Sequence, residues 1–349
     1  MLDAAVAGAV FASPNVRQIS AALQYVRSAA GSVMIVKNYT GDKLNFGLAM
    51  EKFRAVSDTP VNMVLVTDDV AVPRSRCRMV GRRGLAGTVL VHKITGAASA
   101  TGLNVDQVTK VSNHVISHLV TVGSSLEGCY IPGRSDVRVL PADELELGMG
   151  IHNEPGCRRV PTNMDTRHVI GEMLKMLLDK ADKERYFVEW NERSRVAVLV
   201  NNLGGLSVLE LTCLTNMVFD ELKSGYGIVP ERAYSGTYLT SLDGKGFSIS
   251  LLLLPEGEHD GLKSADILEY LDAPTSAVGW STSLVGKQWA ESSVTIHEAP
   301  IANGSSETEK AEIPQGKLGI TRYILGFVAS DTSNRNFFDD CSRCTEVDP

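Results

Sequence analysis

The stretch Val33-Met-Ile-Val-Lys-Asn-Tyr-Thr-Gly-Asp-Lys43 decides the fold, because an apolar run typical of a buried strand passes directly into a polar loop. A helical stretch to about Arg54 follows, and then a second strand-like run over Val61–Thr67. The order strand, helix, strand predicts a βαβ unit, in which helices cover the sheet. Ligands of such sheets bind beyond the carboxyl ends of the strands, so the residues after Val36 are candidate site residues.

Helices and strands are predicted on both sides of this stretch. Before it, Ser13 and Pro14 predict the start of a helix that continues to Gly31. After it, we expect helices at Gly84–Ala98 and Val105–Val120 and then a Gly-, Pro- and Ser-rich crossing over Gly123–Pro141. A second α/β unit is expected to consist of a strand at Leu145–His152, a helix at Asp165–Leu178, a strand at Arg195–Val200, a helix at Leu206–Leu222, and a strand pair, Thr237–Ser241 with Phe247–Leu254, that turns at Asp243-Gly244.

These elements predict an α/β fold with two α/β domains, in which helices pack on mixed or parallel sheets. We expect the first domain at residues 1–122 and the second at residues 123–286. From about Ser292 the periodic patterning fades, so residues 287–349 are expected to be a linker-like or disordered tail. The chain begins with a helix, so the strand and loop that normally precede it in a doubly wound sheet are expected to be missing.

The composition limits the class of function. The chain has 349 residues, of which 44% are hydrophobic and 21% charged, as in ordinary folded proteins. A net charge of −7 argues against nucleic acid or anionic lipid as partner and favours a small molecule. The longest strongly apolar run, Phe247–Leu254, is far shorter than the roughly 20 residues that span a bilayer. Six cysteines are too few for a disulfide scaffold, so we expect a reducing, cytoplasmic location.

A lysine, a glycine and a carboxylate stand together after the first predicted strand. Lys37, Gly41 and Asp42 belong to one polar loop. Such a group at a strand's carboxyl end can bind an oxygen-rich substrate and move a proton. The structural alternative is a strand-to-helix turn in which the Asp42 side chain caps the helix. The sequence leaves both interpretations open.

A second cluster, Gly148-Met-Gly-Ile-His-Asn-Glu-Pro-Gly156, follows a predicted strand in the second half. Its glycines would let a substrate approach the imidazole of His152 closely, and Glu154 could orient that ring. A single histidine is also commonly a structural residue. The motif alone therefore indicates a nucleophile or acid/base group without excluding a structural role.

Four other patterns are weaker. His114 and His118 are one helical turn apart, but no third ligand is near them in the sequence, so we expect no metal site. The turn Asn201–Gly205 could offer backbone N–H groups to phosphate, yet it lacks a Walker lysine. Cys341 and Cys344 have redox or zinc spacing in a polar tail, where such a pair is more often incidental. An arginine cluster is expected to be a solvated surface, with partner docking or anion steering as alternatives: Arg74, Arg76, Arg78, Arg82 and Arg83.

Several motifs occur in the order typical of one known family, and they run from Met1 to about Gly286. They are Phe11-Ala-Ser-Pro14, Val36-Lys-Asn-Tyr-Thr-Gly-Asp42 with Leu44-Asn-Phe-Gly47, Thr67-Asp-Asp-Val70, Gly81-Arg-Arg-Gly-Leu-Ala-Gly87, Gly148–Gly156, Thr240-Ser-Leu-Asp243 and Leu271-Asp-Ala-Pro-Thr275. The chain resembles the dihydroxyacetone kinase (glycerone kinase) family, in its substrate-binding domain, often called DhaK. Residues Asn201–Glu210 are most similar to fungal members.

The resemblance implies a reaction and roles for three residues. Members transfer phosphate from ATP to dihydroxyacetone, and in some cases to glyceraldehyde, in glycerol catabolism. By resemblance, His152 would add to the ketone carbon and form a covalent hemiaminal, a step that selects carbonyl compounds over glycerol. Asp42 would bind the substrate hydroxyl and help to deprotonate it, and Lys37 would contact substrate. A homodimer is expected by the same resemblance.

The chain also departs from the family pattern. Members begin with a further strand and a Gly-Gly-Gly-Ser-Gly-His-Glu-Pro loop that binds substrate and supplies a histidine acid/base, and this chain starts downstream of that loop. The eukaryotic kinases carry a helical domain that binds ATP and Mg²⁺, and nothing after Ser292 resembles it. Gly244 replaces a usual methionine. We therefore expect a chain truncated at both ends, and the rival interpretation is an inactive paralogue that binds a ketose or a partner protein.

Overall fold

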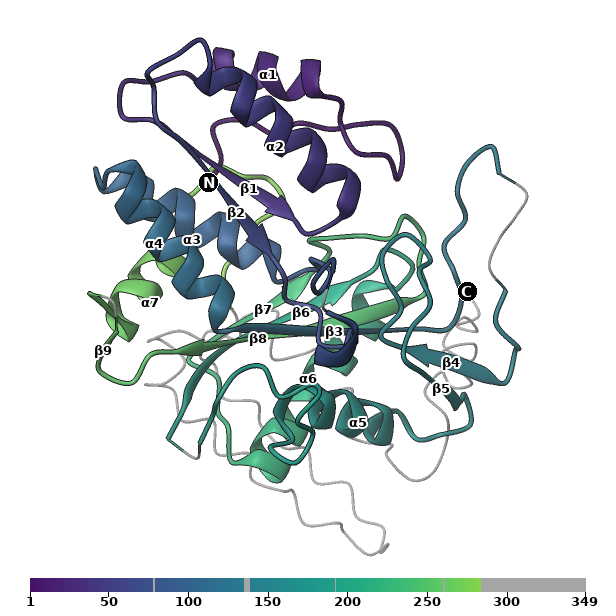
Figure 1. Cartoon of the computed structure of the whole chain (residues 1–349). Helices are drawn as coiled ribbons and strands as arrows, with labels where there is room; N and C mark the ends of the chain where they lie inside the picture. Colours follow the sequence, from purple (N-terminus) through teal and green to yellow (C-terminus); the bar gives the residue numbers. More distant parts are fainter. Residues whose placement is uncertain (78, 135–138, 192, 260, 284–349) are drawn as a thin grey trace, which may run out of the picture. The chain divides into compact units, whose positions relative to one another are not determined.

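The N-terminal part of the fold is a two-stranded parallel sheet covered by helices on both faces. A computed structural model describes residues 1–283 except 78, 135–138, 192 and 260. Strand β1 (Ser32–Lys37) pairs in parallel with β2 (Val61–Val66), with Ser32 opposite Val61. Helices α1 (Val16–Tyr25) and α2 (Thr40–Arg54) lie on one face, as Figure 1 shows. The βαβ unit predicted from the sequence is therefore present.

Alternate residues of β1 point to two different cores, as the two-residue period of a strand requires. Met34 and Val36 pack with the α1 and α2 side chains Leu23 and Phe53 in a small hydrophobic core. Val33 and Ile35 point the other way, toward α3 (Thr88–Ala100) and α4 (Val105–Ser117). Both faces of the small sheet are thus covered by helices.

A six-stranded mixed sheet forms the rest of the fold, in the order β5-β4-β3-β8-β6-β7. Its strands are β3 (Leu119–Ser125), β4 (Glu144–Leu147), β5 (Arg158–Pro161), β6 (Arg195–Asn202), β7 (Arg232–Gly236) and β8 (Gly246–Leu254). Strand β8 is antiparallel to both β3 and β6, whereas β7 is parallel to β6. The fold class predicted from the sequence, α/β with mixed or parallel sheets, is confirmed.

Helices also cover both faces of this sheet (Figure 1). Val198 of β6 faces α5 (Thr166–Leu178) and α6 (Val208–Tyr226) in the largest core. Its neighbour Leu199 faces α3 and α7 (Ser264–Asp272) in the second core. A short hairpin of β9 (Glu258–His259) and β10 (Leu262–Lys263) precedes α7. Burying each such Val or Leu side chain contributes about 1.5–3 kcal/mol, so these two cores stabilise the sheet.

Three helices begin at capping boxes, which satisfy the free N–H groups of a first turn. The N-cap residues are Asn15 of α1, Asn104 of α4 and Ser207 of α6. The N-cap of α1 thus lies two residues after the predicted cap, Ser13, because the Asn15 side chain accepts from the backbone N–H of Gln18.

The predicted strand pair Thr237–Ser241 with Phe247–Leu254 is wrong. Thr237–Ser241 contains no strand, and the neighbours of β8 are β3 and β6. The side chain of Asn201 takes the place of a strand partner, because its Oδ1 accepts from the backbone N–H groups of Tyr238 and Leu239, each at 2.9 Å. Its Nδ2 donates to the Leu239 carbonyl at 2.8 Å. A side chain therefore satisfies the backbone that the prediction assigned to a ladder.

Several other element ends differ from the prediction: α1 ends at Tyr25 and not at Gly31, and α4 ends at Ser117, so that Leu119 and Val120 belong to β3. Two further differences lie at the candidate site. The strand expected at Leu145–His152 ends at Leu147, because Gly148 has a φ of +76°, which takes the chain out of the extended conformation. The helix expected from Gly84 begins at Thr88 instead. In both places the residues that leave the regular element form part of the candidate site.

Residues Met1–Val285 form one compact unit. The predicted domain boundary at residues 122 and 123 falls inside β3, and the division into two domains stays a prediction. The predicted tail at residues 287–349, with Cys341 and Cys344, lies outside the described residues, as does Arg78. Among the described helices, none has both the length and the apolar character needed to cross a bilayer.

Candidate functional site

Lys37 and Asp42 lie where β1 passes into α2. Lys37 is the last residue of β1, and Asp42 lies in the first turn of α2. The N-cap position belongs to Tyr39, and no side chain caps this helix, so the alternative role of Asp42 as N-cap is wrong. A carboxylate in a first helical turn is still favoured by the helix dipole. Asp42 is therefore available for a polar partner other than the helix end.

Lys37 is largely buried beside two carboxylates. Burial lowers the pKa of Lys37, while the negative charges of Asp42 and Asp68 oppose that shift. Burial also lowers the pKa of His92 to about 4, and the positive charge of Lys37 adds to that effect. His92, in α3, is thus neutral at ordinary pH. The sequence analysis did not single out His92, because nothing in its local pattern distinguishes it from a core residue.

His152 lies in a loop whose backbone is held from both sides. Asn153 has a φ of +66°, and its side chain accepts from the N–H of Cys129 at 2.8 Å and donates to the Cys129 carbonyl at 3.0 Å. The hydroxyl of Ser241 donates to the Ile151 carbonyl at 2.7 Å. These bonds fix the residues on both sides of His152.

Glu154 binds His152 twice. Its Oε2 accepts from the His152 backbone N–H at 2.9 Å, and its Oε1 lies 3.1 Å from Nδ1 of the ring. Burial alone would raise the pKa of Glu154, but the hydrogen bonds from the His152 ring and backbone outweigh it and lower the pKa to about 2. The expected orientation of His152 by Glu154 is thus present. The ring of His152 remains 29% exposed, so one side of it can be reached.

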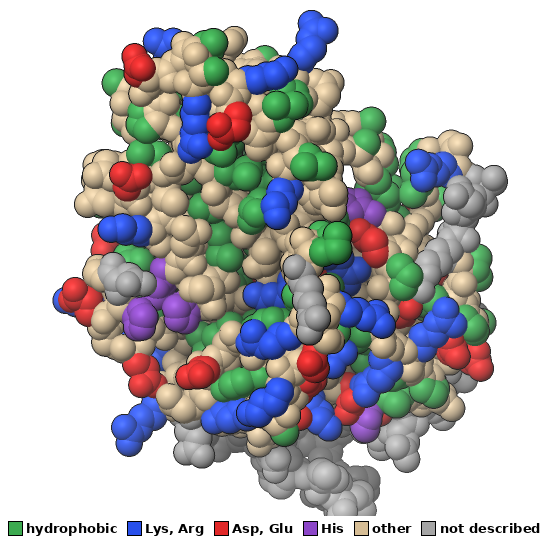
Figure 2. Space-filling view, viewed as in Figure 1, with side chains coloured by type: hydrophobic (Ala, Val, Ile, Leu, Met, Phe, Trp, Pro, Cys, Tyr) green, Lys and Arg blue, Asp and Glu red, His purple; other side chains and the backbone are tan. Residues whose placement is uncertain are grey.

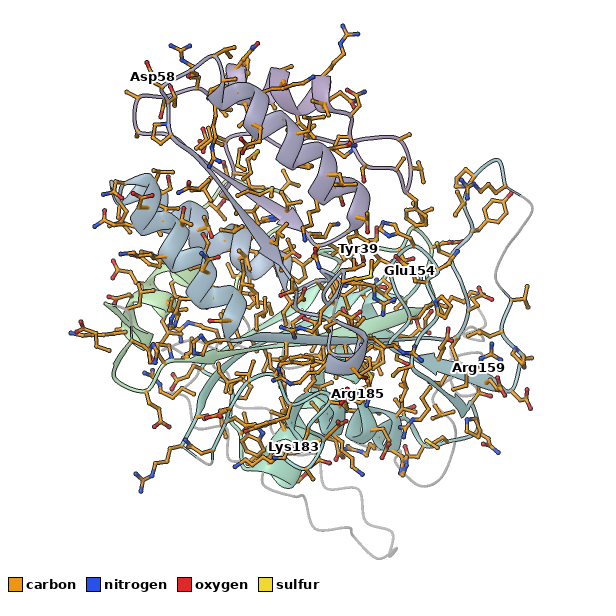
Figure 3. All side chains as sticks on the ribbon, viewed as in Figure 1. Tyr39, Asp58, Glu154, Arg159, Lys183 and Arg185 are labelled. Carbon is orange, nitrogen blue, oxygen red and sulfur yellow. The ribbon has the colours of Figure 1, made fainter. Side chains whose placement is uncertain are left out.

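The two predicted site segments meet at Tyr39. The His152 ring lies edge-to-face with Tyr39, with centroids 4.8 Å apart, and in the same way with Phe11 at 4.8 Å. Tyr39 also packs against a small core formed by Leu85, Ile151 and Leu203. Figure 3 labels Tyr39 and Glu154, which point toward the same region beneath α2. The segment that carries Lys37 and Asp42 therefore lies against the loop that carries His152.

The site also contains a buried acidic pair, to which the sequence analysis assigned no role. Asp68 and Asp69 follow β2 and are fully buried. Asp68 accepts from the backbone N–H groups of Leu85 at 2.7 Å and Gly87 at 3.0 Å. Asp69 binds Nε of Arg83 at 2.6 Å. Burial raises the pKa of Asp69 to about 6 against the opposing charge of Arg83.

The predicted solvated arginine cluster is correct for some members and wrong for others. Arg74 and Arg76 are exposed, and Figure 2 shows basic side chains over the loop that carries the short 3₁₀ helix η1 (Arg74–Arg76). Arg83 is only 16% exposed and belongs to the site. The guanidinium of Arg82 lies 3.9 Å above the ring of Phe187. Two adjacent acids directly after a buried strand were the signal that could have identified an internal partner for Arg83.

The remaining candidates have structural roles in the described residues. The N–H groups of the Asn201–Gly205 turn are occupied, because Gly204 donates to Oδ1 of Asn202 at 2.8 Å. Leu203 and Gly205 donate to the carbonyls of Gly246 and Gly244, each at 3.0 Å. His114 and His118 stack at 4.3 Å, and His259 of β9 lies near both rings. Across the described part of the chain, no group of three or more His, Cys, Asp or Glu side chains could hold a metal ion.

Comparison with known proteins identifies similar chains. Residues 1–279 match the Dak1 domain. The chain is 43% identical over 324 residues to a dihydroxyacetone kinase of Pichia angusta, which covers 88% of this chain and 52% of that protein. It is 42% identical to dihydroxyacetone kinase 2 of Saccharomyces cerevisiae, over 80% of this chain and 46% of the relative. The chain spans about half the length of the curated relatives it matches.

Two solved structures are similar as well. The dihydroxyacetone kinase from C. freundii in complex with AMP-PNP and Mg²⁺ superposes with a TM-score of 0.69 at 31% identity, over 88% of this chain and 51% of that one. The dihydroxyacetone kinase operon co-activator Dha-DhaQ superposes with a TM-score of 0.67 at 27% identity. It covers 77% of this chain and 78% of the co-activator chain.

Proposed function

The chain belongs to the dihydroxyacetone kinase family, whose Dak1 domain it carries, and from this premise we propose that it holds dihydroxyacetone for phosphorylation by ATP. The observation that supports this proposal best is the contact between Glu154 and Nδ1 of His152. With a pKa of about 2, Glu154 is a carboxylate that can only accept a hydrogen bond. Nδ1 therefore carries the proton, and Nε2 keeps its lone pair for a carbonyl carbon.

The first step of the proposed reaction is addition of His152 to the substrate. Nε2 forms a bond to the ketone carbon while the carbon–oxygen π bond breaks. The oxygen takes up a proton and becomes a hydroxyl, and the ring releases the proton of Nδ1 to solvent, so the hemiaminal forms without a leaving group. Glycerol has no carbonyl carbon, so this step excludes it, whereas glyceraldehyde can enter as a second substrate.

Lys37 and Asp42 would act on the substrate hydroxyl. Asp42 accepts its proton as the oxygen attacks phosphorus, and Lys37 contacts the substrate oxygens. Their position at the end of β1, in the segment that lies against His152 through Tyr39, supports this assignment. The negative charge of Asp42 opposes the lowering of the Lys37 pKa that burial causes.

We propose that ATP and Mg²⁺ are bound by residues other than those of the described unit. The N–H groups of the Asn201–Gly205 turn are occupied, so the turn has no donors for the phosphates of ATP. The described residues also offer no group of three or more side chains for Mg²⁺. The similar C. freundii kinase was solved with AMP-PNP and Mg²⁺, and this chain covers half of it. We propose further that the protein is a cytoplasmic homodimer that takes part in glycerol catabolism and has no nucleic acid or membrane partner.

Carbon NMR with dihydroxyacetone labelled at the ketone carbon tests the covalent step. We expect the ketone resonance to be replaced by that of a tetrahedral carbon in the wild-type chain and to persist unchanged with His152→Ala. His168→Ala removes an exposed histidine of α5 and serves as the matched control. An adduct that survives in His152→Ala would refute the assignment of the nucleophile.

The second candidate is a ketose-binding protein that transfers no phosphate. The similarity to the co-activator Dha-DhaQ favours it, because that chain is covered over most of its length. A coupled assay with ATP and Mg²⁺ separates the two functions. Adduct formation without turnover by the full-length protein supports the binding protein, and turnover that Asp42→Asn lowers while the adduct persists supports the kinase.

A further inference from the structure

Arg83 connects the buried Asp69 to the loop that carries His152. Its Nε binds Oδ2 of Asp69 at 2.6 Å, and its Nη2 donates to the Gly148 carbonyl at 2.8 Å. Planar guanidinium donors fix direction as well as distance, which a lysine ammonium does not. One side chain thus joins the end of β2 to the first residue of the His152 loop.

Asp69 is itself rigidly held, so it can serve as a fixed point. Its Oδ1 accepts from the Ala71 N–H at 2.8 Å, and its own N–H donates to the Arg83 carbonyl at 3.1 Å. It also forms a parallel bridge with Thr121 in β3. Backbone contacts with three segments therefore fix the position of Asp69.

The other end of Arg83 approaches Glu154. A Cβ atom built on Gly150 would lie 2.6 Å from Nη1 of Arg83 and 2.2 Å from Oε2 of Glu154, so both groups border the same point. Burial lowers the pKa of Arg83, but the charge of Asp69, the Asp69 hydrogen bond and the charge of Glu154 raise it above the ordinary value. Arg83 consequently stays charged and attracts the Glu154 carboxylate.

We propose that Asp69 and Arg83 form a positioning pair that places the Glu154 carboxylate and thereby decides which ring nitrogen of His152 faces the substrate. Neither residue touches the substrate in this arrangement. Hydrogen bonds join Asp69 to Arg83 and Arg83 to the Gly148 carbonyl, and Glu154 to His152, while Arg83 and Glu154 both border the Cβ position of Gly150. The importance of the ring nitrogen for catalysis rests on the proposed function, whereas the positioning of the ring does not.

Nitrogen NMR of ¹⁵N-histidine-labelled protein tests the positioning directly, without substrate. The His152 signals are assigned by their loss in His152→Gln. We expect the Nδ1–H tautomer in the wild-type chain and a mixture of tautomers in Arg83→Lys, which keeps the charge but cannot bind Asp69 and Gly148 together. With dihydroxyacetone, the rate of adduct formation should fall about ten- to hundredfold, the equivalent of one charge-assisted hydrogen bond.

Two further variants separate positioning from folding. Breaking a buried ion pair destabilises a protein, whereas replacing both partners is often neutral. Arg83→Gln leaves the buried Asp69 charge unpaired, so the double variant Asp69→Asn/Arg83→Gln should regain melting temperature relative to Arg83→Gln, without regaining the tautomer. Arg232→Lys is the matched control, because Arg232 is 10% exposed and pairs with Asp272 at the β7 end of the sheet.

The outcomes distinguish this proposal from the proposed function. A wild-type tautomer in both Arg83→Lys and the double variant overturns the positioning pair, and so does an equal change in Arg232→Lys. If the wild-type chain forms no adduct at all, the proposed function fails, while the tautomer measurements still decide the positioning.

Discussion

Replacing Gly150 with alanine should disconnect Glu154 from His152 while leaving the backbone in place. The added Cβ would lie 2.2 Å from Oε2 of Glu154 and 2.6 Å from Nη1 of Arg83, and contacts under 3.0 Å are not tolerated. Both atoms are the ends of flexible side chains, so they can move instead of the backbone. To reach an ordinary van der Waals contact, the Glu154 carboxylate must move by roughly an ångström.

The magnitude of this change follows from the bonds that the carboxylate loses. At its new place it cannot keep both the 2.9 Å bond to the His152 N–H and the 3.1 Å contact with the ring. A hydrogen bond to a charged group contributes about 1.5–3 kcal/mol, and water replaces part of it because the Glu154 side chain is 33% exposed. We expect Gly150→Ala to lower the free energy of unfolding by about 1–3 kcal/mol.

Two measurements check this prediction. Urea unfolding at pH 7 gives the change in free energy, and NMR titration of the Glu154 carboxyl should show its pKa rising from about 2 toward the ordinary 4.5. Gly47→Ala and Gly171→Ala are the controls, because a Cβ at either helical position meets nothing within 4 Å. Each control should gain about 0.5–1 kcal/mol. If Gly150→Ala is as stable as these controls and leaves the Glu154 pKa unchanged, the reasoning is refuted.

Two other predictions concern stability. The pKa of Glu154 is lowered in the folded state, so its contribution to the free energy of unfolding is present above pH 4.5 and is lost as the pH falls toward about 2. After allowance for the exposure of Glu154, Glu154→Gln should remove about 1–2 kcal/mol of this pH-dependent free energy, measured by urea unfolding. Identical pH dependence in the variant and the wild type would contradict the prediction. Leu174→Ala, in the largest core, should cost about 2–5 kcal/mol in the same unfolding assay through the cavity it leaves, and a cost below that of a typical surface substitution would mean that α5 does not pack as described.

The sequence allowed the local parts of the fold to be predicted better than the contacts between distant parts. The strand at Val61–Val66 and the helix at Thr166–Leu178 follow from apolar periodicity and from capping residues nearby in the chain. The strand pair after Gly236 was wrong because the partner of that segment is the Asn201 side chain, which no turn pattern indicates. The sequence likewise does not indicate that β8 pairs with β3 and β6, because β8 is buried on both faces.

The same distinction holds for the site. Each of the two candidate segments could be located from a strand end followed by polar residues, and the Glu154–His152 contact follows from two residues close in the sequence. The Asp69–Arg83 pair was missed, because an arginine among other arginines has the pattern of a solvated surface, and the two adjacent acids after β2 indicate an internal partner without indicating which arginine it is. Only the folded chain places that one guanidinium beneath the His152 loop.

The small separate core under α1 and α2 has a consequence for hydrogen exchange. Stability is uneven within a protein, and a region with few buried apolar contacts opens at a lower free energy than the rest. The core around Phe53 and Met34 contains far fewer residues than either core of the six-stranded sheet, so amide protons of β1 and α2 should exchange before those of β6 and β8. Each such opening carries Lys37 and Asp42 away from His152. A ligand that binds both sides keeps the region closed, so slower exchange in α2 would report occupancy of the site without any chemical step.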